Sequence, residues 1–279
     1  MFNFLKKKIG IIGFGNMGQA IAERINPNYA VRVFEKDKAK TKDLIGIGQA
    51  ANILQLVKQS QVIILAIKPQ DFEPALAQIK GNLRNKLVIS IAAGITTEYI
   101  QKVLGKVRLV RVMPNLAVKV GRSTTSICKG AFAADADLKF TARLFEYLGK
   151  VFIFPEELMD AATAISGSGP AYIFYDMEIN HRDPAKLSEA NEEAYIRKLS
   201  EAALKVGFDP EIAEDLAIST TASSISLSAQ GGKTPAQLRQ MVTSPGGTTE
   251  AALKVITAGG SWSQAALAAK QRARELSKK

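Results

Sequence analysis

The sequence predicts an α/β domain built on a mostly parallel sheet, followed by an all-α domain. In the first half of the chain, short apolar runs alternate with stretches of helical spacing, which is typical of a parallel sheet covered on both faces. Pro155 ends that alternation, and only helical periodicity follows. A length of 279 residues accommodates two domains of ordinary size. We therefore expect one domain over residues 1–155 and a second over residues 156–279.

The spacing of apolar residues predicts where each strand and helix lies along the chain. The strands of the first domain are Lys8–Ile12, Val31–Glu35, Val62–Ile67, Leu87–Ile91, Arg108–Val112, Ser123–Cys128 and Val151–Phe154. The helices between them are Asn16–Arg24, Asp37–Ile45, Asp71–Lys80, Thr97–Val103 and Ala136–Leu148. The helices of the second domain are Leu158–Ile165, Ala171–Ile179, Glu192–Val206, Ile212–Ala229, Thr248–Ala258 and Ser263–Leu276. Its many Ala, Ser and Gly residues allow close helix packing, either as a bundle within one chain or intertwined with a second copy. A homodimer or higher homo-oligomer through these helices is the expected partner.

Composition excludes several classes of protein. Cys128 is the only cysteine and His181 the only histidine, so neither a disulfide framework nor a His/Cys metal cluster is expected. No apolar run approaches the roughly 18 residues of a membrane helix. The N-terminal residues lack the features of a secretory signal. The expectation is a cytoplasmic protein with no metal and no membrane partner.

The positive charge is concentrated in one part of the chain. The chain has 37 Lys and Arg against 26 Asp and Glu, a formal charge of +11. Residues 80–134 hold ten of the basic residues and a single acid, Glu98. A nucleic-acid interface would need stacking aromatics or a recognition motif, and this stretch offers only Tyr99 and Phe132. No nucleic-acid partner is expected; a solvated face, or attraction of an anionic cofactor or substrate, explains the charge.

A glycine motif lies between the first strand and the first helix. Gly13, Gly15 and Gly18 form G-x-G-x-x-G in the strand–turn–helix context that a Rossmann-type dinucleotide site requires. The first glycine permits the tight turn, the second lets the backbone approach the pyrophosphate, and the third allows close helix packing. The motif therefore predicts cofactor contacts at Gly13, Phe14, Gly15, Asn16, Met17 and Gly18.

The end of the second strand bears on the choice of cofactor. Glu35 lies 22 residues after Gly13, where an acid accepts hydrogen bonds from the ribose 2′-hydroxyl. A carboxylate there would repel a 2′-phosphate, which favours NADH. Lys36 and Lys38 could still reach such a phosphate, so NADPH stays open.

Four further segments carry a family resemblance. They are Ala66-Ile-Lys-Pro-Gln70, Arg111-Val-Met-Pro-Asn115, Gly167-Ser-Gly-Pro-Ala-Tyr172 and Val242-Thr-Ser-Pro-Gly-Gly-Thr-Thr249. With the glycine motif, their order and spacing resemble the pyrroline-5-carboxylate reductases over nearly the whole chain. That family reduces the cyclic imine 1-pyrroline-5-carboxylate to L-proline with NADPH or NADH, the last step of proline biosynthesis.

The resemblance implies site residues at both ends of the chain. The further cofactor contacts that it implies are Ala66, Ile67, Lys68, Pro69, Met113, Pro114 and Asn115. The substrate carboxylate would be held by Ser244, Gly246, Gly247 and Thr248, ahead of a helix whose free N–H groups suit an anion. The hydroxyl of Thr249 would lie near the imine nitrogen and is the implied catalytic residue.

The chemistry of an imine is consistent with the lone histidine. A ketone reduction creates an alkoxide that needs a proton donor. A pyrroline imine can bind already protonated, so orientation, a carboxylate clamp and a polar contact suffice. His181 lies outside the matched motifs and is expected on the surface; Tyr172 is expected to pack in the core or at an interface.

Two other functions stay open at the level of sequence. One is another imine or 2-hydroxyacid oxidoreductase on the same scaffold. Related hydroxyacid dehydrogenases carry G-x-G-x-x-x-K, and here Ile173 occupies the lysine position after Gly167 and Gly169. The other is a non-catalytic dinucleotide-binding protein.

The chain departs from the family pattern in two places. Residues 176–196 resemble an insertion of about twenty residues within a helix that the family uses for dimer packing. Family members also often carry an acid shortly before the position of Pro235, where this chain has Gly232-Lys233-Thr234.

Overall fold

The computed structural model describes residues 6–42, 44–68, 71–230 and 232–277. The chain divides into two compact units. The first contains Met1–Val112 and Ile127–Tyr147, and the second contains Met113–Ser126 and Leu148–Lys279.

This division differs from the predicted boundary at residue 155. The segment Met113–Ser126 belongs to the second unit, and two side-chain hydrogen bonds attach it there. Asn115 Nδ2 donates to Ser223 Oγ at 3.0 Å. The hydroxyl of Thr124 lies 2.8 Å from that of Ser219. The second unit is not purely helical, because it also holds strand β8 (Gly149–Ile153) and part of β7 (Ser123–Lys129).

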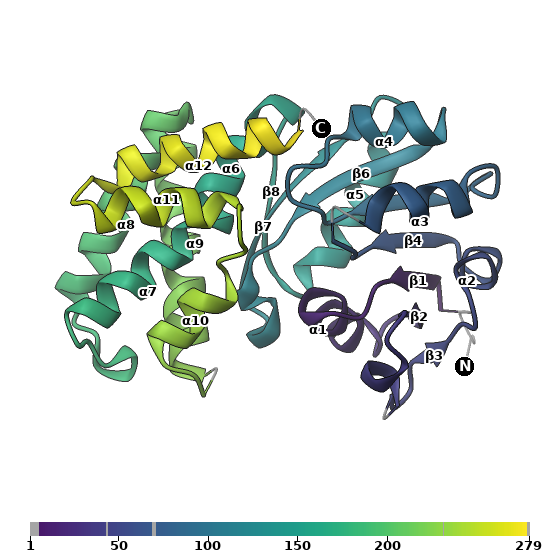
Figure 1. The fold of residues 1–279 in the computed structure, drawn as a ribbon, viewed down its shortest axis with the longest axis horizontal. Coiled ribbons are helices and arrows are strands. Elements are labelled where there is room, and N and C mark those ends of the chain that lie inside the picture. The colour runs from purple at the N-terminus through teal and green to yellow at the C-terminus, as the bar shows by residue number, and fades with distance from the viewer. Residues whose placement is uncertain (1–5, 43, 69–70, 231, 278–279) are drawn as a thin grey trace. The chain divides into compact units, whose positions relative to one another are not determined.

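The first unit contains a parallel sheet, as predicted. Its strands are β1 (Lys8–Ile12), β2 (Ala30–Phe34), β3 (Gly48–Gln49), β4 (Val62–Leu65), β5 (Leu87–Ser90) and β6 (Arg108–Met113). They lie in the order β3-β2-β1-β4-β5-β6, and every pair among them is parallel (Figure 1). The sheet continues through β7 (Ser123–Lys129) and β8 (Gly149–Ile153). This is the strand order of a dinucleotide-binding doubly wound fold, with its switch point at β1 and β4.

The helices of the first unit confirm four predictions and correct one. They are α1 (Asn16–Ile25), α2 (Ile53–Gln59), α3 (Phe72–Ile79), α4 (Thr97–Leu104) and α5 (Asp135–Glu146). The predicted helix Asp37–Ile45 is wrong; its described part contains only a 3₁₀ turn, Lys38–Thr41. The carboxylate of Asp37 accepts from the Ala39 N–H, a local bond that competes with helix formation.

Helix α2 and strand β3 were not predicted. The helix begins after Asn52, whose side chain accepts from the Gln55 N–H at 2.8 Å. Leu56 and Val57 are fully buried in the apolar cluster on one face of the sheet. With only seven residues, α2 is too short to show a clear helical period in the sequence.

The second unit is dominated by helices. They are α6 (Met159–Ala162), α7 (Gly169–Ile179), α8 (Glu189–Val206), α9 (Pro210–Gln230), α10 (Pro235–Met241), α11 (Thr248–Thr257) and α12 (Trp262–Ser277). A π-helical turn, Thr163–Gly167, joins α6 to α7. Helix α8 packs on α9 and α12, and α11 packs on α12 (Figure 1). The unpredicted helix α10 begins with Thr234 and Gln237 in a reciprocal capping box.

The segment that resembled an insertion, residues 176–196, comprises the end of α7, the turn that follows it and the first part of α8. Asp176 anchors it, because its Oδ2 accepts from Arg182 Nε at 3.1 Å and from the Tyr195 hydroxyl at 2.8 Å. Ser188 then caps α8 by accepting from the Asn191 N–H. His181 is exposed at this turn, which confirms its expected place on the surface.

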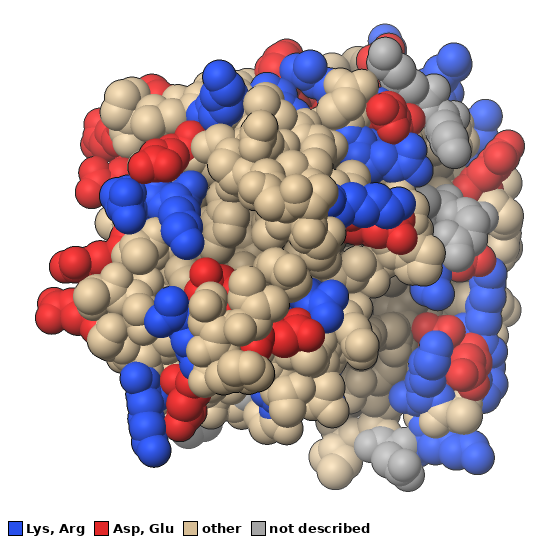
Figure 2. All heavy atoms as spheres, turned by 60° about the vertical axis from the view of Figure 1, so that its left-hand side comes forward, with Lys and Arg blue, Asp and Glu red and all other residues tan. Residues whose placement is uncertain are grey.

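The surface is mixed in charge. On the face drawn in Figure 2, Lys and Arg side chains are interspersed with Asp and Glu side chains and with uncharged surface. Within the described ranges, no helix combines the length and the apolar character needed to span a membrane.

Candidate functional site

The glycine loop after β1 has a distinct reason for each of its three glycines. Gly13 has φ +96°, and a Cβ there would lie 2.4 Å from the Ala66 carbonyl oxygen. A Cβ on Gly18 would lie 2.2 Å from the carbonyl oxygen of Gly13. A Cβ on Gly15 would have nothing within 4 Å. Gly13 and Gly18 are therefore required by packing, whereas Gly15 leaves open space at the place where a pyrophosphate would approach.

Helix α1 presents an uncapped N-terminus at this loop. Its cap residue is Gly15, no side chain among the described residues bonds to its first amides, and its first turn holds no acid. The N–H groups of Asn16, Met17 and Gly18 have no partner within the described part of the chain. Unpaired amides and the helix dipole together favour an anion at this end.

Glu35 is fixed beside the same loop by backbone donors. Its Oε2 accepts from the Phe14 N–H at 2.6 Å, and its Oε1 accepts from the Asp37 N–H at 3.1 Å. Each carboxylate oxygen keeps a lone pair for a further donor. The side chain is therefore held at the carboxyl end of β2, as a ribose contact requires.

A hollow of about 320 Å³ lies at the carboxyl ends of β1, β2 and β4. Six predicted cofactor residues line it: Gly13, Gly15, Glu35, Ala66, Ile67 and Lys68. Pro69 lies outside the described residues. Ile53, Lys40, Asp71 and Gln78 also line the hollow and were missed, because only the packing of neighbouring elements brings them there.

Two lysines near Glu35 are already paired. Lys36 Nζ lies 2.6 Å from Asp71 Oδ1, and Lys40 Nζ lies 3.8 Å from Asp37 Oδ2. Both pairs are largely exposed, so each is weak and open to exchange.

The basic stretch 80–134 contributes a separate cluster. Arg84, Lys86, Lys106 and Arg108 line a hollow of about 360 Å³ at the amino ends of β5 and β6. The glycine loop follows the carboxyl end of β1, at the opposite edge of the parallel sheet. These four side chains do not line the hollow at the glycine loop, and Lys36, Lys40 and Lys68 do. Burial lowers the pKa of Lys86.

The predicted residues Met113, Pro114 and Asn115 lie in the second unit. Asn115 is 3% exposed, and its Oδ1 accepts from the Ala117 and Thr124 N–H groups. Met113 Cε lies 2.8 Å from where a Cβ on Gly167 would be. The Asn115 side chain therefore has a structural role, and Met113 packs against the Gly-Ser-Gly motif.

A second uncapped helix N-terminus lies at α11. Its cap is Gly247, and within the described ranges no side chain bonds to its first amides. The Gly246 N–H donates to Glu250 Oε2 at 2.9 Å, and the Gly247 N–H donates to the Ser244 carbonyl at 3.0 Å. Two of the predicted carboxylate donors are therefore engaged within the turn. Thr248, Thr249 and Glu250 supply the amides that have no partner among the described residues.

Three buried hydroxyls meet at the start of α11. Ser168 Oγ lies 3.0 Å from Thr248 Oγ1. The Thr249 hydroxyl donates to Ser168 Oγ at 3.2 Å. Ser168 is fully buried, and Thr249 is 5% exposed. The sequence marked the Gly-Ser-Gly motif but gave Ser168 no role, because its partners lie about eighty residues away.

The Tyr172 hydroxyl bonds to the backbone near this cluster. Its hydroxyl donates to the Ala164 carbonyl at 3.0 Å, within the π-helical turn. The side chain is fully buried, and burial raises the pKa of Tyr172 far above its ordinary value. Tyr172 therefore stays neutral and packs in the core, as predicted.

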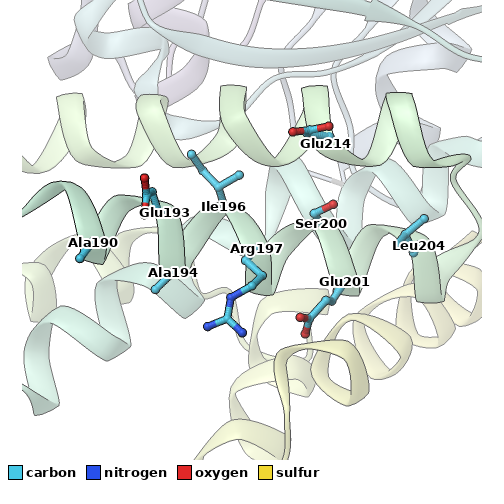
Figure 3. A pocket seen from close by; sticks show the side chains of 9 residues that line it. All are labelled: Ala190, Glu193, Ala194, Ile196, Arg197, Ser200, Glu201, Leu204 and Glu214. Atoms are coloured by element: carbon cyan, nitrogen blue, oxygen red, sulfur yellow. The ribbon is translucent and has the colours of Figure 1, made fainter.

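Another hollow, of about 570 Å³, lies on the exposed face of α8. Figure 3 shows its lining side chains on α8, with Glu214 on the neighbouring helix α9. None of the predicted site residues lines it. Among the described residues, no group of three His, Cys, Asp or Glu side chains is arranged to hold a metal ion.

The fold and the glycine loop define a dinucleotide-binding protein with a Rossmann-type sheet and a helical second unit. The chain belongs to the pyrroline-5-carboxylate reductase family. Residues 190–276 match the family described as pyrroline-5-carboxylate reductase dimerisation. Residues 8–94 match the family described as NADP oxidoreductase coenzyme F420-dependent.

Relatives support the assignment over nearly the full length. The chain is 34% identical to pyrroline-5-carboxylate reductase of Methanosarcina acetivorans, over 98% of this chain and 99% of the relative. It is 32% identical to pyrroline-5-carboxylate reductase 2 of Bacillus subtilis, over 90% and 87%. The solved pyrroline-5-carboxylate reductase of Coxiella burnetii aligns with a TM-score of 0.66 and 32% identity, over 98% of this chain and 100% of that one. The Plasmodium falciparum pyrroline carboxylate reductase with NADP bound aligns with a TM-score of 0.62 and 25% identity, over 98% and 99%.

Proposed function

We propose that the chain reduces 1-pyrroline-5-carboxylate to L-proline with a nicotinamide dinucleotide, the last step of proline biosynthesis. Family membership gives the reaction class. The observation that carries the proposal is the start of α11, where free amides and the Thr249 hydroxyl lie together. An anionic carboxylate and a ring nitrogen separated by one carbon match that pairing of groups.

The cofactor site fits a dinucleotide. NADH or NADPH, when bound, supplies the hydride. The open space at Gly15 and the free amides of α1 would hold the pyrophosphate, and Glu35 would accept from the ribose.

The substrate site needs no strong acid. The amides of Thr248, Thr249 and Glu250 would bind the carboxylate, and the Thr249 hydroxyl would contact the ring nitrogen. When the imine binds protonated, a hydride added to its carbon sends the π electrons to nitrogen as a lone pair. The product amine is then neutral at nitrogen, and no proton moves in that step. The chain's part is to orient the ring and to stabilise its carboxylate.

We further propose that NADH is preferred over NADPH. Glu35 would repel a 2′-phosphate, and backbone N–H donors to both of its carboxylate oxygens hold that charge at the end of β2. Glu35→Gln removes the repulsion and keeps an acceptor, so the ratio of kcat/KM with NADPH to that with NADH should rise about tenfold. Steady-state kinetics with both cofactors measures it; Glu73→Gln, on the first turn of α3, is the control. An unchanged ratio would remove Glu35 from cofactor selection.

The helical unit is proposed to form a homo-oligomer. The match to a dimerisation family covers residues 190–276, which include most of α8. That helix exposes Leu204 to 45% beside the hollow of Figure 3, so its free face carries apolar surface. Light scattering on the purified chain, with Leu204→Glu as the disrupting variant, tests this proposal.

One assay separates this function from its alternatives. Pyrroline-5-carboxylate, other cyclic imines and 2-keto acids are offered with NADH and NADPH, and cofactor oxidation is followed by absorbance. We expect turnover of pyrroline-5-carboxylate. Turnover of a keto acid alone would indicate a hydroxyacid oxidoreductase. Tight cofactor binding without any turnover would indicate a non-catalytic binding protein.

A further inference from the structure

The serine of the Gly-Ser-Gly motif is held in place by both of its glycine neighbours. A Cβ on Gly167 would lie 2.8 Å from Met113 Cε, and a Cβ on Gly169 would lie 3.1 Å from Leu199 Cδ2. The Ser168 N–H donates to the Thr163 carbonyl at 2.9 Å, the five-residue spacing of a π turn. Such turns are uncommon and are frequent at functional sites.

The hydrogen-bond direction at Ser168 limits what Thr249 can do. A hydroxyl has one proton and two lone pairs. The Thr249 proton is directed to Ser168 Oγ at 3.2 Å. Thr249 Oγ1 therefore offers only lone pairs to anything else. Ser168 completes its own bonding with Thr248 Oγ1, 3.0 Å away.

We propose that Ser168 is a positioning residue that makes Thr249 a hydrogen-bond acceptor, so that the site takes ligands whose ring nitrogen carries a proton. This rests on the proposed function, because it names the form of substrate that the site admits. A protonated imine presents an N–H donor and matches the Thr249 oxygen. A ring atom without hydrogen would face lone pair against lone pair.

Charged groups do not share this hydrogen-bond network. The neighbouring elements α7, α11 and α12 carry the ionisable side chains Tyr172, Tyr175, Asp176, Glu178, Glu250, Lys254, Lys270, Arg272, Arg274 and Glu275. In the described part of the chain, none of them bonds to a hydroxyl of Ser168, Thr248 or Thr249. Hydroxyl direction alone therefore sets the polarity of the contact.

The test compares two ligands of the same shape and opposite polarity. L-proline carries N–H donors at the ring nitrogen, and tetrahydrofuran-2-carboxylate carries a ring oxygen that only accepts. Their dissociation constants are measured by calorimetry on the full-length protein. In Ser168→Ala the Thr249 proton is released, so affinity for tetrahydrofuran-2-carboxylate relative to L-proline should rise about fivefold to tenfold.

A matched control lies two residues away. Ser166 is also fully buried, and its hydroxyl donates to the Ala162 carbonyl at 2.9 Å. Ser166→Ala removes a buried hydroxyl without touching Thr249, so the ligand ratio should stay at the wild-type value. Thr249→Val removes the acceptor itself, and adding Ser168→Ala to it should leave the ratio unchanged.

Each outcome decides the proposal. An unchanged ratio in Ser168→Ala, or an equal change in Ser166→Ala, would overturn it. If thermal melting shows that Ser168→Ala does not fold, Ser168→Cys keeps the volume with a weaker acceptor and should shift the ratio in the same direction. Because the ratio is measured by binding, failure here is distinct from failure of the proposed function, which would appear as no turnover of pyrroline-5-carboxylate.

Discussion

Two helices in this chain have similar N-termini, but different contacts surround them. Helices α1 and α11 each have ten residues and a glycine cap, and no side chain in the described part of the chain bonds to their first amides. Both are therefore suited to an anion. At α1 the surrounding contacts come from β1, β2 and β4, and its first turn has no acid. At α11 the Glu250 carboxylate accepts from the Gly246 N–H, and the Ser168 hydroxyl oxygen accepts from the Thr249 hydroxyl.

The difference shows what a compact motif can encode. At the glycine loop, Gly13 and Gly18 are required by close contacts with backbone carbonyls, and Gly15 leaves open space at the helix start. At α11 the turn supplies free amides but leaves the polarity of Thr249 to a distant segment. The first site is tightly constrained by packing, and the second is constrained by a few hydrogen bonds.

The largest expected effect comes from the tight packing at α1. In Gly13→Ala the new Cβ would lie 2.4 Å from the Ala66 carbonyl oxygen at φ +96°. We expect a loss of about 3 kcal/mol in the free energy of unfolding, from strain and overpacking together. Urea denaturation measures it.

Gly246→Ala is the counterpart at α11. Gly246 has φ +68°, and the nearest atom to its Cβ position is Arg272 Nη2 at 3.6 Å. Only the left-handed backbone is unfavourable there, at about 1 kcal/mol. Equal losses for the two variants would contradict the contrast between the two helix starts.

The next prediction concerns Gly15→Ala, which should change cofactor affinity much more than stability. Gly15→Ala places a Cβ where nothing lies within 4 Å, so the free energy of unfolding should change by less than about 1 kcal/mol. The same methyl group would occupy the space that a pyrophosphate needs, so NADH affinity should fall about tenfold. Fluorescence titration with NADH measures the affinity. Unchanged binding would mean that the pyrophosphate does not approach this glycine.

The smallest effect concerns the acid at α11. Glu250→Gln keeps an oxygen for the Gly246 N–H and removes a negative charge from the helix start. The KM for pyrroline-5-carboxylate should fall about twofold, because a charge near a helix terminus contributes about 0.3–1 kcal/mol at low salt. Kinetics at low and high salt check it, since screening should remove the gain. A rise in KM would show that the charge of Glu250 assists binding.

Much of the first unit follows from the sequence, and the exceptions have physical reasons. Strands β4 and β5 were predicted because they are almost wholly apolar runs that both faces of the sheet bury. Residues 37–45 were predicted to form a helix from their periodicity. The Ala39 N–H donates to the Asp37 carboxylate instead, and periodicity does not reveal such a local bond. The sequence did not predict that Arg84 and Lys106 lie together. Only the order and direction of the strands bring them to the same end of the sheet.

The sequence by itself determined the parallel sheet, the glycine loop and the helical second half, because these depend on neighbours a few residues apart. The tertiary structure alone decided that Met113–Ser126 belongs to the second unit, through the bond from Asn115 to Ser223. It also decided which amides of the α11 turn are free, and that Ser168 meets Thr249 across 81 residues of chain. A hydrogen bond needs its two atoms about 3 Å apart in space, and no local pattern fixes that distance for residues so far apart in the chain.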